Sequence, residues 1–221
     1  QFATWTGRYA PVSTTHYPWA HIVEPLVPTH IVVKDVDASY NYSWRVTYEA
    51  SAARGGGTVV LVKSACCAPE IVVEFPHAAQ LYDVYMYKIV NGATAHAVSE
   101  PVMCKYVRRE LRDLTRDDRE RFLDALEIVH RMPLEEGRAK FGGKFMDATG
   151  ATRKHLARMT LDRCTPHHNG KVFFNAHAAY TLEMEQSLQL IDATIAMPYW
   201  DYTIDAKFFG DDGPSSEVWS S

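Results

Sequence analysis

Residues 168–186 read HNGKVFFNAHAAYTLEMEQ, and this stretch carries the most informative pattern of the sequence. His168 stands on a glycine-containing loop, and His177 follows nine residues later at the start of a predicted helix over residues 176–190. The loop can fold back so that the two imidazoles face the same point. Neutral imidazole binds Cu, Zn, Fe or Ni, and three imidazoles without a thiolate or carboxylate favour copper or catalytic zinc. The stretch therefore predicts a metal site at the start of a helix.

His155, at the end of a second predicted helix over residues 151–159, is the candidate for a third ligand. Two other histidines of this region compete for the role. His167 would break the nine-residue spacing, and His130 lies just before the helix-ending Pro133, where an exposed helix terminus is the simpler interpretation. Taken without their flanking residues, two histidines nine residues apart are more simply interpreted as surface or hydrogen-bonded core positions.

The sequence before this stretch also has helical spacing, from Met103 to Arg131. Thr115 followed by Asp118 resembles a capping box and predicts a helix start inside this range. Its many arginines alternate with acidic residues, which is typical of a solvated helix face rather than of a nucleic-acid-binding patch.

The first hundred residues have a different character, with short runs rich in β-branched and aromatic residues. Strands are predicted over residues 30–36, 42–48, 58–62, 71–75 and 81–87, with turn formers such as Asn91-Gly92 between some of them. Their spacing predicts an antiparallel β-sandwich, immunoglobulin- or fibronectin-like. Residues 1–29 are interpreted as an extended arm or an ordered tail, and the character changes at Glu100-Pro101. The predicted fold class is α+β, with domains over 1–100 and 101–221.

Composition excludes several classes of protein. The chain has 221 residues, 47% of them hydrophobic, and a net charge of −4, so it can bury a core and is neither disordered nor an electrostatic nucleic-acid binder. It contains no apolar run long enough to span a membrane. It starts at Gln1 without a leader, which indicates a processed chain or a fragment, and a secreted or extracellular location is expected.

Among the four cysteines, Cys66 or Cys67 is expected to pair with Cys104 in a disulfide, and Cys164 then has no expected partner.

The residues around the histidine pair resemble the copper-A half of the type-3 copper family, which comprises tyrosinases, catechol oxidases and molluscan-type haemocyanins. The matching elements occur in the family's order and spacing: His168-Asn169-Gly170, Phe173-Phe174, His177, Met184-Glu185-Gln186-Ser187-Leu188 and Pro198-Tyr199-Trp200-Asp201-Tyr202. Residues 103–115 are similar to the entry helix of tyrosinase-like proteins, including those of algae and oomycetes. The resemblance covers residues 101–212.

This resemblance implies a mainly helical copper-A half-bundle in which His155, His168 and His177 hold one copper ion. Glu185 is too far round the helix to bind the same ion and is interpreted as a buried hydrogen-bonding group. Asp201 is expected to accept from an arginine or a backbone N–H. Some family members link a cysteine to the second copper-A histidine. In those members the cysteine stands two residues before that histidine. Cys164 stands four residues before His168, so a buried free thiol or a disulfide is favoured over the link.

A complete family member holds two copper ions, yet no histidine follows Trp200 in this sequence. We expect the chain to be the front part of a longer polypeptide rather than a natural half-protein. The complete protein is expected to oxidise phenols or o-diphenols, or tyrosyl groups, to quinones with dioxygen. An oxygen carrier with the same ligands is one alternative. The other is a catalytically inactive extracellular structural or adhesive protein that takes part in an assembly. The expected partners include neither nucleic acid nor a membrane-spanning segment.

Overall fold

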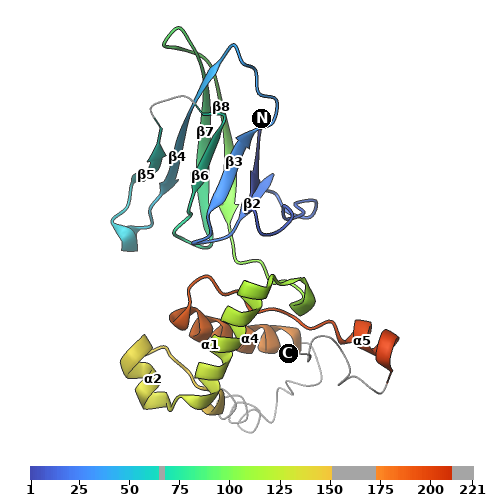
Figure 1. Ribbon diagram of the computed structural model, residues 1–221. Helices are drawn as coiled ribbons and strands as arrows, with labels where there is room; N and C mark the ends of the chain where they lie inside the picture. The colour runs from blue at the N-terminus through green and yellow to red at the C-terminus, as the bar shows by residue number, and fades with distance from the viewer. Residues whose placement is uncertain (65–67, 151–172, 211–221) are drawn as a thin grey trace. The chain divides into compact units, whose positions relative to one another are not determined.

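The computed structural model describes residues 1–64, 68–150 and 173–210 (Figure 1). The chain divides into two compact units, Gln1–Val107 and Arg108–Ser221. The described secondary structure of the first is mainly β-strand and that of the second is mainly helical. The mixed α and β composition agrees with the predicted fold class.

Two sheets make up the first unit. One has the strand order β1-β3-β6 and the other the order β2-β8-β7-β4-β5. The strands are β1 (Phe2–Trp5), β2 (His21–Val23), β3 (Thr29–Val33), β4 (Asn41–Glu49), β5 (Thr58–Lys63), β6 (Glu70–Val73), β7 (Gln80–Val90) and β8 (Ala93–Cys104), with a short 3-10 helix, η1 (Ala52–Arg54), before β5. The five strands expected from the sequence are confirmed as β3 to β7. Residues 1–29, expected to form an arm, instead contribute β1 to one sheet and β2 to the other.

Period-two alternation explains the core of this unit. Tyr42, Trp44 and Val46 of β4 are buried, as are Tyr82 and its alternate neighbours on β7. A single hydrophobic cluster joins these side chains to Phe2, Ile31 and Val73 of the other sheet. The buried Trp44 indole donates its Nε1 hydrogen to the Ala68 carbonyl over 3.0 Å, so its polar group is satisfied. The two sheets therefore share one core.

Strand β8 corrects two expectations. It continues through Glu100-Pro101, where the sequence changes character, and ends at Cys104, so Met103 and Cys104 lie in a strand and not in a helix. It pairs antiparallel with β7 along its length and parallel with β2 over Val102 to Cys104.

Cys104 is a buried free thiol, and the expected disulfide to this residue is wrong. Burial, with a smaller effect of Glu24, raises the pKa of the thiol to about 12. Cys66 and Cys67 lie outside the described residues.

The second unit contains η2 (Leu111–Asp113), α1 (Arg116–Arg131), α2 (Leu134–Phe141), α4 (Phe173–Ile191) and α5 (Tyr202–Phe209). Helix α1 starts as predicted, because the Thr115 hydroxyl accepts from the Asp118 amide over 3.2 Å. The expected helix over residues 103–114 is wrong. Its backbone groups pair elsewhere: the Leu111 amide donates to the Tyr199 carbonyl and the Tyr199 amide to the Arg109 carbonyl, both over 2.9 Å.

The core of the second unit forms where α1 meets α4. Phe122, Ala125 and Val129 lie on one face of α1 and pack in a cluster with Leu188 of α4 and with Phe145. The apolar spacing that predicted this helix therefore marks its buried face. The description of α4 starts at Phe173, and the chain is already helical there, three residues before the predicted start. Over the described ranges, no helix combines the length and apolar character that a membrane crossing needs.

Gly137 gives the first testable prediction. It lies on α2 directly against the Phe145 ring, and a Cβ at this position would come within 2.0 Å of a ring carbon. Gly137→Ala is expected to lower the free energy of unfolding of the helical unit by about 1–3 kcal/mol, because overpacking outweighs the gain in helix propensity. Urea unfolding followed by the helical circular dichroism signal measures this change.

Gly143→Ala is the matched control, since a Cβ there would meet nothing within 4 Å. An equal loss of stability in both variants would contradict the prediction.

Candidate metal centre

His177 lies in the first turns of α4, half-buried, and its ring orientation is fixed from within the helix. The imidazole Nδ1 donates to the Phe173 carbonyl one turn earlier over 2.8 Å, and the Phe173 ring lies 4.2 Å from the imidazole, centroid to centroid. Since a carbonyl can only accept, the proton is on Nδ1, and a neutral ring then carries its lone pair on Nε2. Such a backbone bond sets the tautomer of metal-binding histidines.

The other two predicted ligands, His155 and His168, lie outside the described residues, as do the competing His167 and Cys164. Within the described ranges, no group of three or more histidine, cysteine, aspartate or glutamate side chains could hold a metal ion. The three-histidine set therefore remains a prediction. His130 is described: it is exposed near the end of α1, and its Nδ1 donates to the Leu126 carbonyl over 2.8 Å. Its exposure agrees with the helix terminus expected from the sequence.

Thr181, Met184 and Leu188 follow His177 at helical spacing and so lie on the same face of α4, which points towards the core. Thr181, one turn on, donates its hydroxyl to the His177 carbonyl over 2.9 Å. Met184 packs against the core cluster and Leu188 is fully buried within it. One end of this stripe therefore presents the imidazole, and the other anchors the helix.

Glu185 is buried and fixes α4 to two other segments of the unit. Its carboxylate accepts from Arg108 Nε over 3.1 Å, from Arg108 Nη2 over 2.6 Å and from the Met197 amide over 2.7 Å. The hydrogen bonds that Arg108 donates to Glu185 raise the pKa of Arg108 against the opposing effect of burial. The prediction that Glu185 is a buried hydrogen-bonding group is confirmed, and its partners lie in the loop before α1 and in the extended segment after α4.

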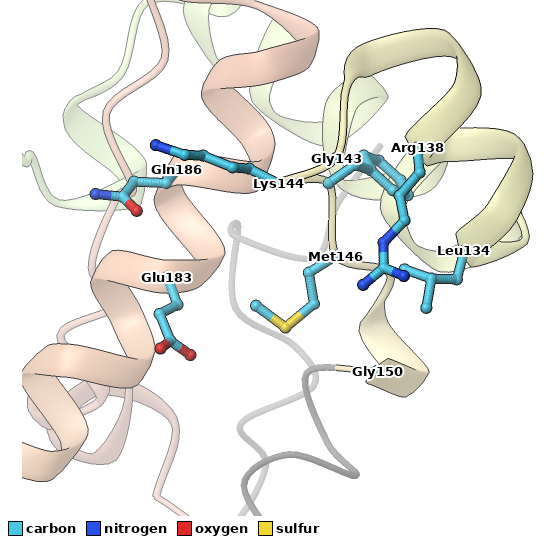
Figure 2. Close-up of a pocket in the computed structure, with 9 residues that line it drawn as sticks. Leu134, Arg138, Gly143, Lys144, Met146, Gly150, Glu183 and Gln186 are labelled. Atoms are coloured by element: carbon cyan, nitrogen blue, oxygen red, sulfur yellow. The ribbon is translucent and has the colours of Figure 1, made fainter.

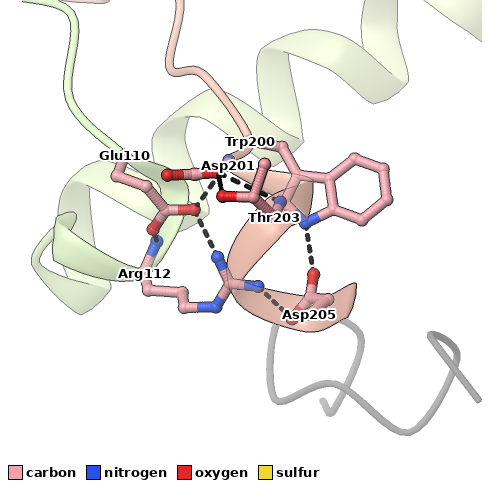
Figure 3. Close-up of polar contacts among 6 residues, drawn as sticks. All are labelled: Glu110, Arg112, Trp200, Asp201, Thr203 and Asp205. Atoms are coloured by element: carbon pink, nitrogen blue, oxygen red, sulfur yellow. Dashed lines mark hydrogen bonds and ion pairs between the residues drawn. The ribbon is translucent and has the colours of Figure 1, made fainter. Parts of the chain in front are cut away.

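A second buried network was not predicted from the sequence (Figure 3). Arg112 bridges two buried carboxylates, those of Glu110 and Asp205. Asp205 also accepts from the indole Nε1 of Trp200. Burial opposes the charge of the Arg112 guanidinium, but the hydrogen bond to Asp205 and the charges of both carboxylates together raise its pKa. The network ties the segment before α1 to α5.

Asp201 completes this junction as the N-cap of α5. Its carboxylate accepts from the Thr203 amide over 3.0 Å, and its own amide donates to Glu110 over 3.2 Å (Figure 3). The predicted bond to a backbone N–H is confirmed, whereas the arginine partner belongs to Asp205. The aromatic element around Trp200 is therefore held by both backbone and side-chain bonds.

Part of this unit is similar to known proteins. Residues 123–219 match the family described as "Common central domain of tyrosinase". The tyrosinase of Streptomyces glaucescens is 30% identical over 99 residues, which is 45% of this chain and 32% of the relative. The aligned stretch thus spans about a third of the relative's length. No solved structure matches the chain. All three predicted copper ligands fall within the matched residues.

Proposed function

We propose that this chain provides one copper site of a tyrosinase-like protein that oxidises phenols and o-diphenols to quinones with dioxygen. The observation that carries the proposal is the half-buried His177, which stands within the tyrosinase-like residues on the face of α4 that continues into the core through Met184 and Leu188. The histidine-based donor set fits a copper ion. When bound, copper would supply the redox chemistry with dioxygen, and the protein would supply orientation and access.

The proposed ligands are His155, His168 and His177. The contribution of the described residues is to fix α4, which carries His177. Leu188 anchors the helix in the core, and Glu185 ties it to Arg108 and to the Met197 amide. Ligands held by such surrounding bonds keep their geometry when the metal is absent.

The proposal extends to parts that the comparisons do not reach. A dicopper protein of this kind needs a second set of histidine ligands, and residues 201–221 contain no histidine. The helical unit is then a copper-A half-bundle, and the first unit an immunoglobulin- or fibronectin-like sandwich that serves as an interaction module in a secreted protein. Its two sheets with a common core support this assignment.

Copper uptake by the whole chain tests the proposal. After loading with Cu(II) and removal of weakly bound metal, atomic absorption is expected to find one copper ion per chain. Electron paramagnetic resonance is expected to show splitting from coordinated nitrogen. A chain that retains no copper, or binds it without nitrogen ligands, would overturn the proposal in favour of the inactive structural or adhesive protein. In a polypeptide that contains both copper sites, quinone formation from an o-diphenol distinguishes an oxidase from an oxygen carrier.

A further inference from the structure

A cavity of about 540 Å³ lies between α2, the loop after it and α4 in the helical unit (Figure 2). Arg138, Lys144 and Glu183 line it, and its wall reaches Gly150, where the described range ends. The described residues therefore do not define what this cavity binds. In the first unit, by contrast, an open strand edge belongs to a sheet whose listed strands are all described: β2, β8, β7, β4 and β5.

Strand β8 lies at the edge of this sheet over most of its length. On the side away from β7, it pairs with β2 over residues 102–104. Among the described strands, none pairs with residues 93–101 on this side. The chain before β2 turns at residues 14–17 and contains Pro18, which has no N–H for a ladder, so β2 does not continue along β8. Most side chains of this open edge are exposed.

The backbone groups of β8 face its two sides in alternation. The Lys105 amide donates to the Val23 carbonyl of β2 over 2.8 Å, so Lys105 faces away from β7. Alternate residues share this direction, which places Ala97, Ser99 and Pro101 on the open edge. Ala97 and Ser99 each present an N–H and a C=O there. Pro101 lacks an N–H and stands where a sheet tolerates proline, at an edge.

Little along this edge opposes pairing with another strand. Natural edge strands are often protected by lysines, inward-pointing charges or bulges. Residues 93–99 contain no lysine, arginine, aspartate or glutamate. A β-bulge interrupts the pairing with β7 between Lys88 and Ile89, opposite Ala95. The regular part of the edge therefore runs over residues 96–101.

A second copy of the same strand fits this edge in antiparallel orientation. When Val98 stands opposite Val98 of the second copy, Ala97 of each copy pairs with Ser99 of the other. Both residues present their backbone groups outward, so the two pairs form about four N–H···O=C bonds. The arrangement is two-fold symmetric, so it closes with two copies and leaves the same edge unavailable to a third.

The same register brings acidic and basic side chains together. His96 of one copy stands opposite Glu100 of the other, and Lys88 is the neighbour of His96 on β7. The Lys88 Nζ lies 5.1 Å from the centroid of the Tyr40 ring. The Glu100 carboxylate is held by the His21 Nε2 over 2.7 Å. Each end of the paired edge thus combines basic side chains of one copy with a carboxylate of the other.

We propose that the chain forms a two-fold symmetric dimer in which the β8 edges of two copies pair antiparallel around Val98. The two five-stranded sheets then join into one continuous sheet. The contacts come from the first unit, so the dimer does not depend on the proposed copper site.

Sedimentation velocity of the full chain measures this association. Between about 1 and 100 µM, the unmodified chain is expected to shift from monomer to dimer as its concentration rises. Ser99→Pro removes an N–H that faces the open edge and keeps the bonds between β8 and β7, so it is expected to weaken dimerisation at least about tenfold. Ser99→Ala keeps this N–H and is the matched control, which is expected to dimerise as the unmodified chain does.

The variant His96→Glu tests the register by a second route. It places a carboxylate opposite Glu100 of the other copy and is expected to weaken dimerisation about tenfold, because like charges then meet at both ends. His96 is exposed, so the fold is expected to persist. His130→Glu makes the same change of charge on α1 and is expected to leave the dimer unchanged.

A chain that remains monomeric at about 100 µM would overturn the proposal. So would equal dimerisation of Ser99→Pro and Ser99→Ala, or of His96→Glu and His130→Glu. Val60→Lys places a charge at an exposed position of β5, the strand at the opposite edge of the same sheet. Loss of the dimer in this variant, and not in Ser99→Pro, would assign the interface to that edge and contradict the pairing of β8.

Discussion

The variant Asp205→Ala is expected to lower the free energy of unfolding of the helical unit by about 2–3 kcal/mol. Breaking a fully buried ion pair costs about 3–5 kcal/mol, and the Arg112 side chain is 22% exposed, so part of that cost is recovered by hydration. The change also leaves the Trp200 indole N–H without the buried carboxylate that accepts from it. Urea unfolding followed by the helical circular dichroism signal measures the loss.

Two further variants separate charge from hydrogen bonding at this position. Asp205→Asn keeps an oxygen that can accept from Trp200 but removes the charge that faces Arg112, so an intermediate loss is expected. Glu120→Ala breaks the exposed pair between Arg116 and Glu120 and is expected to cause no measurable loss. If Asp205→Ala were as stable as Glu120→Ala, the buried network would not contribute to stability as argued.

This network also shows where sequence reasoning stops. Arg112 and Asp205 are 93 residues apart, and neither belongs to a periodic pattern or a motif that would pair them. The Pro-Tyr-Trp-Asp element drew attention to Asp201, which is an N-cap, rather than to Asp205 four residues later. Local chemistry predicts caps because their partners are two or three residues away. It cannot predict a partner that the fold brings from the other end of the unit.

The strands of the first unit also differ in how far their own sequence predicts them. The alternation of buried side chains made β4 and β7 predictable, whereas β8 begins with Ala93-Thr94-Ala95-His96-Ala97, in which only small alanines alternate with polar residues and all side chains are exposed. Its pairing with β7 starts from Asn91-Gly92, both with positive φ (50° and 79°), as a two-residue hairpin turn of type I′ requires. The turn was recognised, but the strand after it depends on its partner.

The segment that leads into α1 is not the helix that its local spacing predicts, because its backbone groups pair with distant residues instead. Residues 103–114 have helical spacing, yet Cys104 pairs with β2 and Leu111 with Tyr199. These partners satisfy backbone groups that a helix would otherwise satisfy within itself. The helix that did form, α1, is the part of the predicted range with both a capping residue, Thr115, and a buried apolar face.

The variant His177→Ala is expected to abolish the retention of copper by the chain. Loss of an outer hydrogen-bond partner weakens metal binding about 10–100-fold, and loss of a direct ligand is expected to cost more. Because His177 is half-buried near the start of α4, away from the core contacts of Leu188, the fold is expected to persist. Competition with a chelator of known affinity, read by atomic absorption, measures the change.

His130→Ala provides a matched control, since its imidazole makes the same bond to a carbonyl four residues earlier, at the same 2.8 Å, on another helix. If the proposed centre is correct, this variant retains copper as the unmodified chain does, because a fixed tautomer alone does not make a ligand. His177→Ala should also lose the nitrogen splitting assigned to coordinated imidazole in part or in full. Equal copper affinity in the two variants would exclude His177 from the centre, whatever the remaining histidines bind.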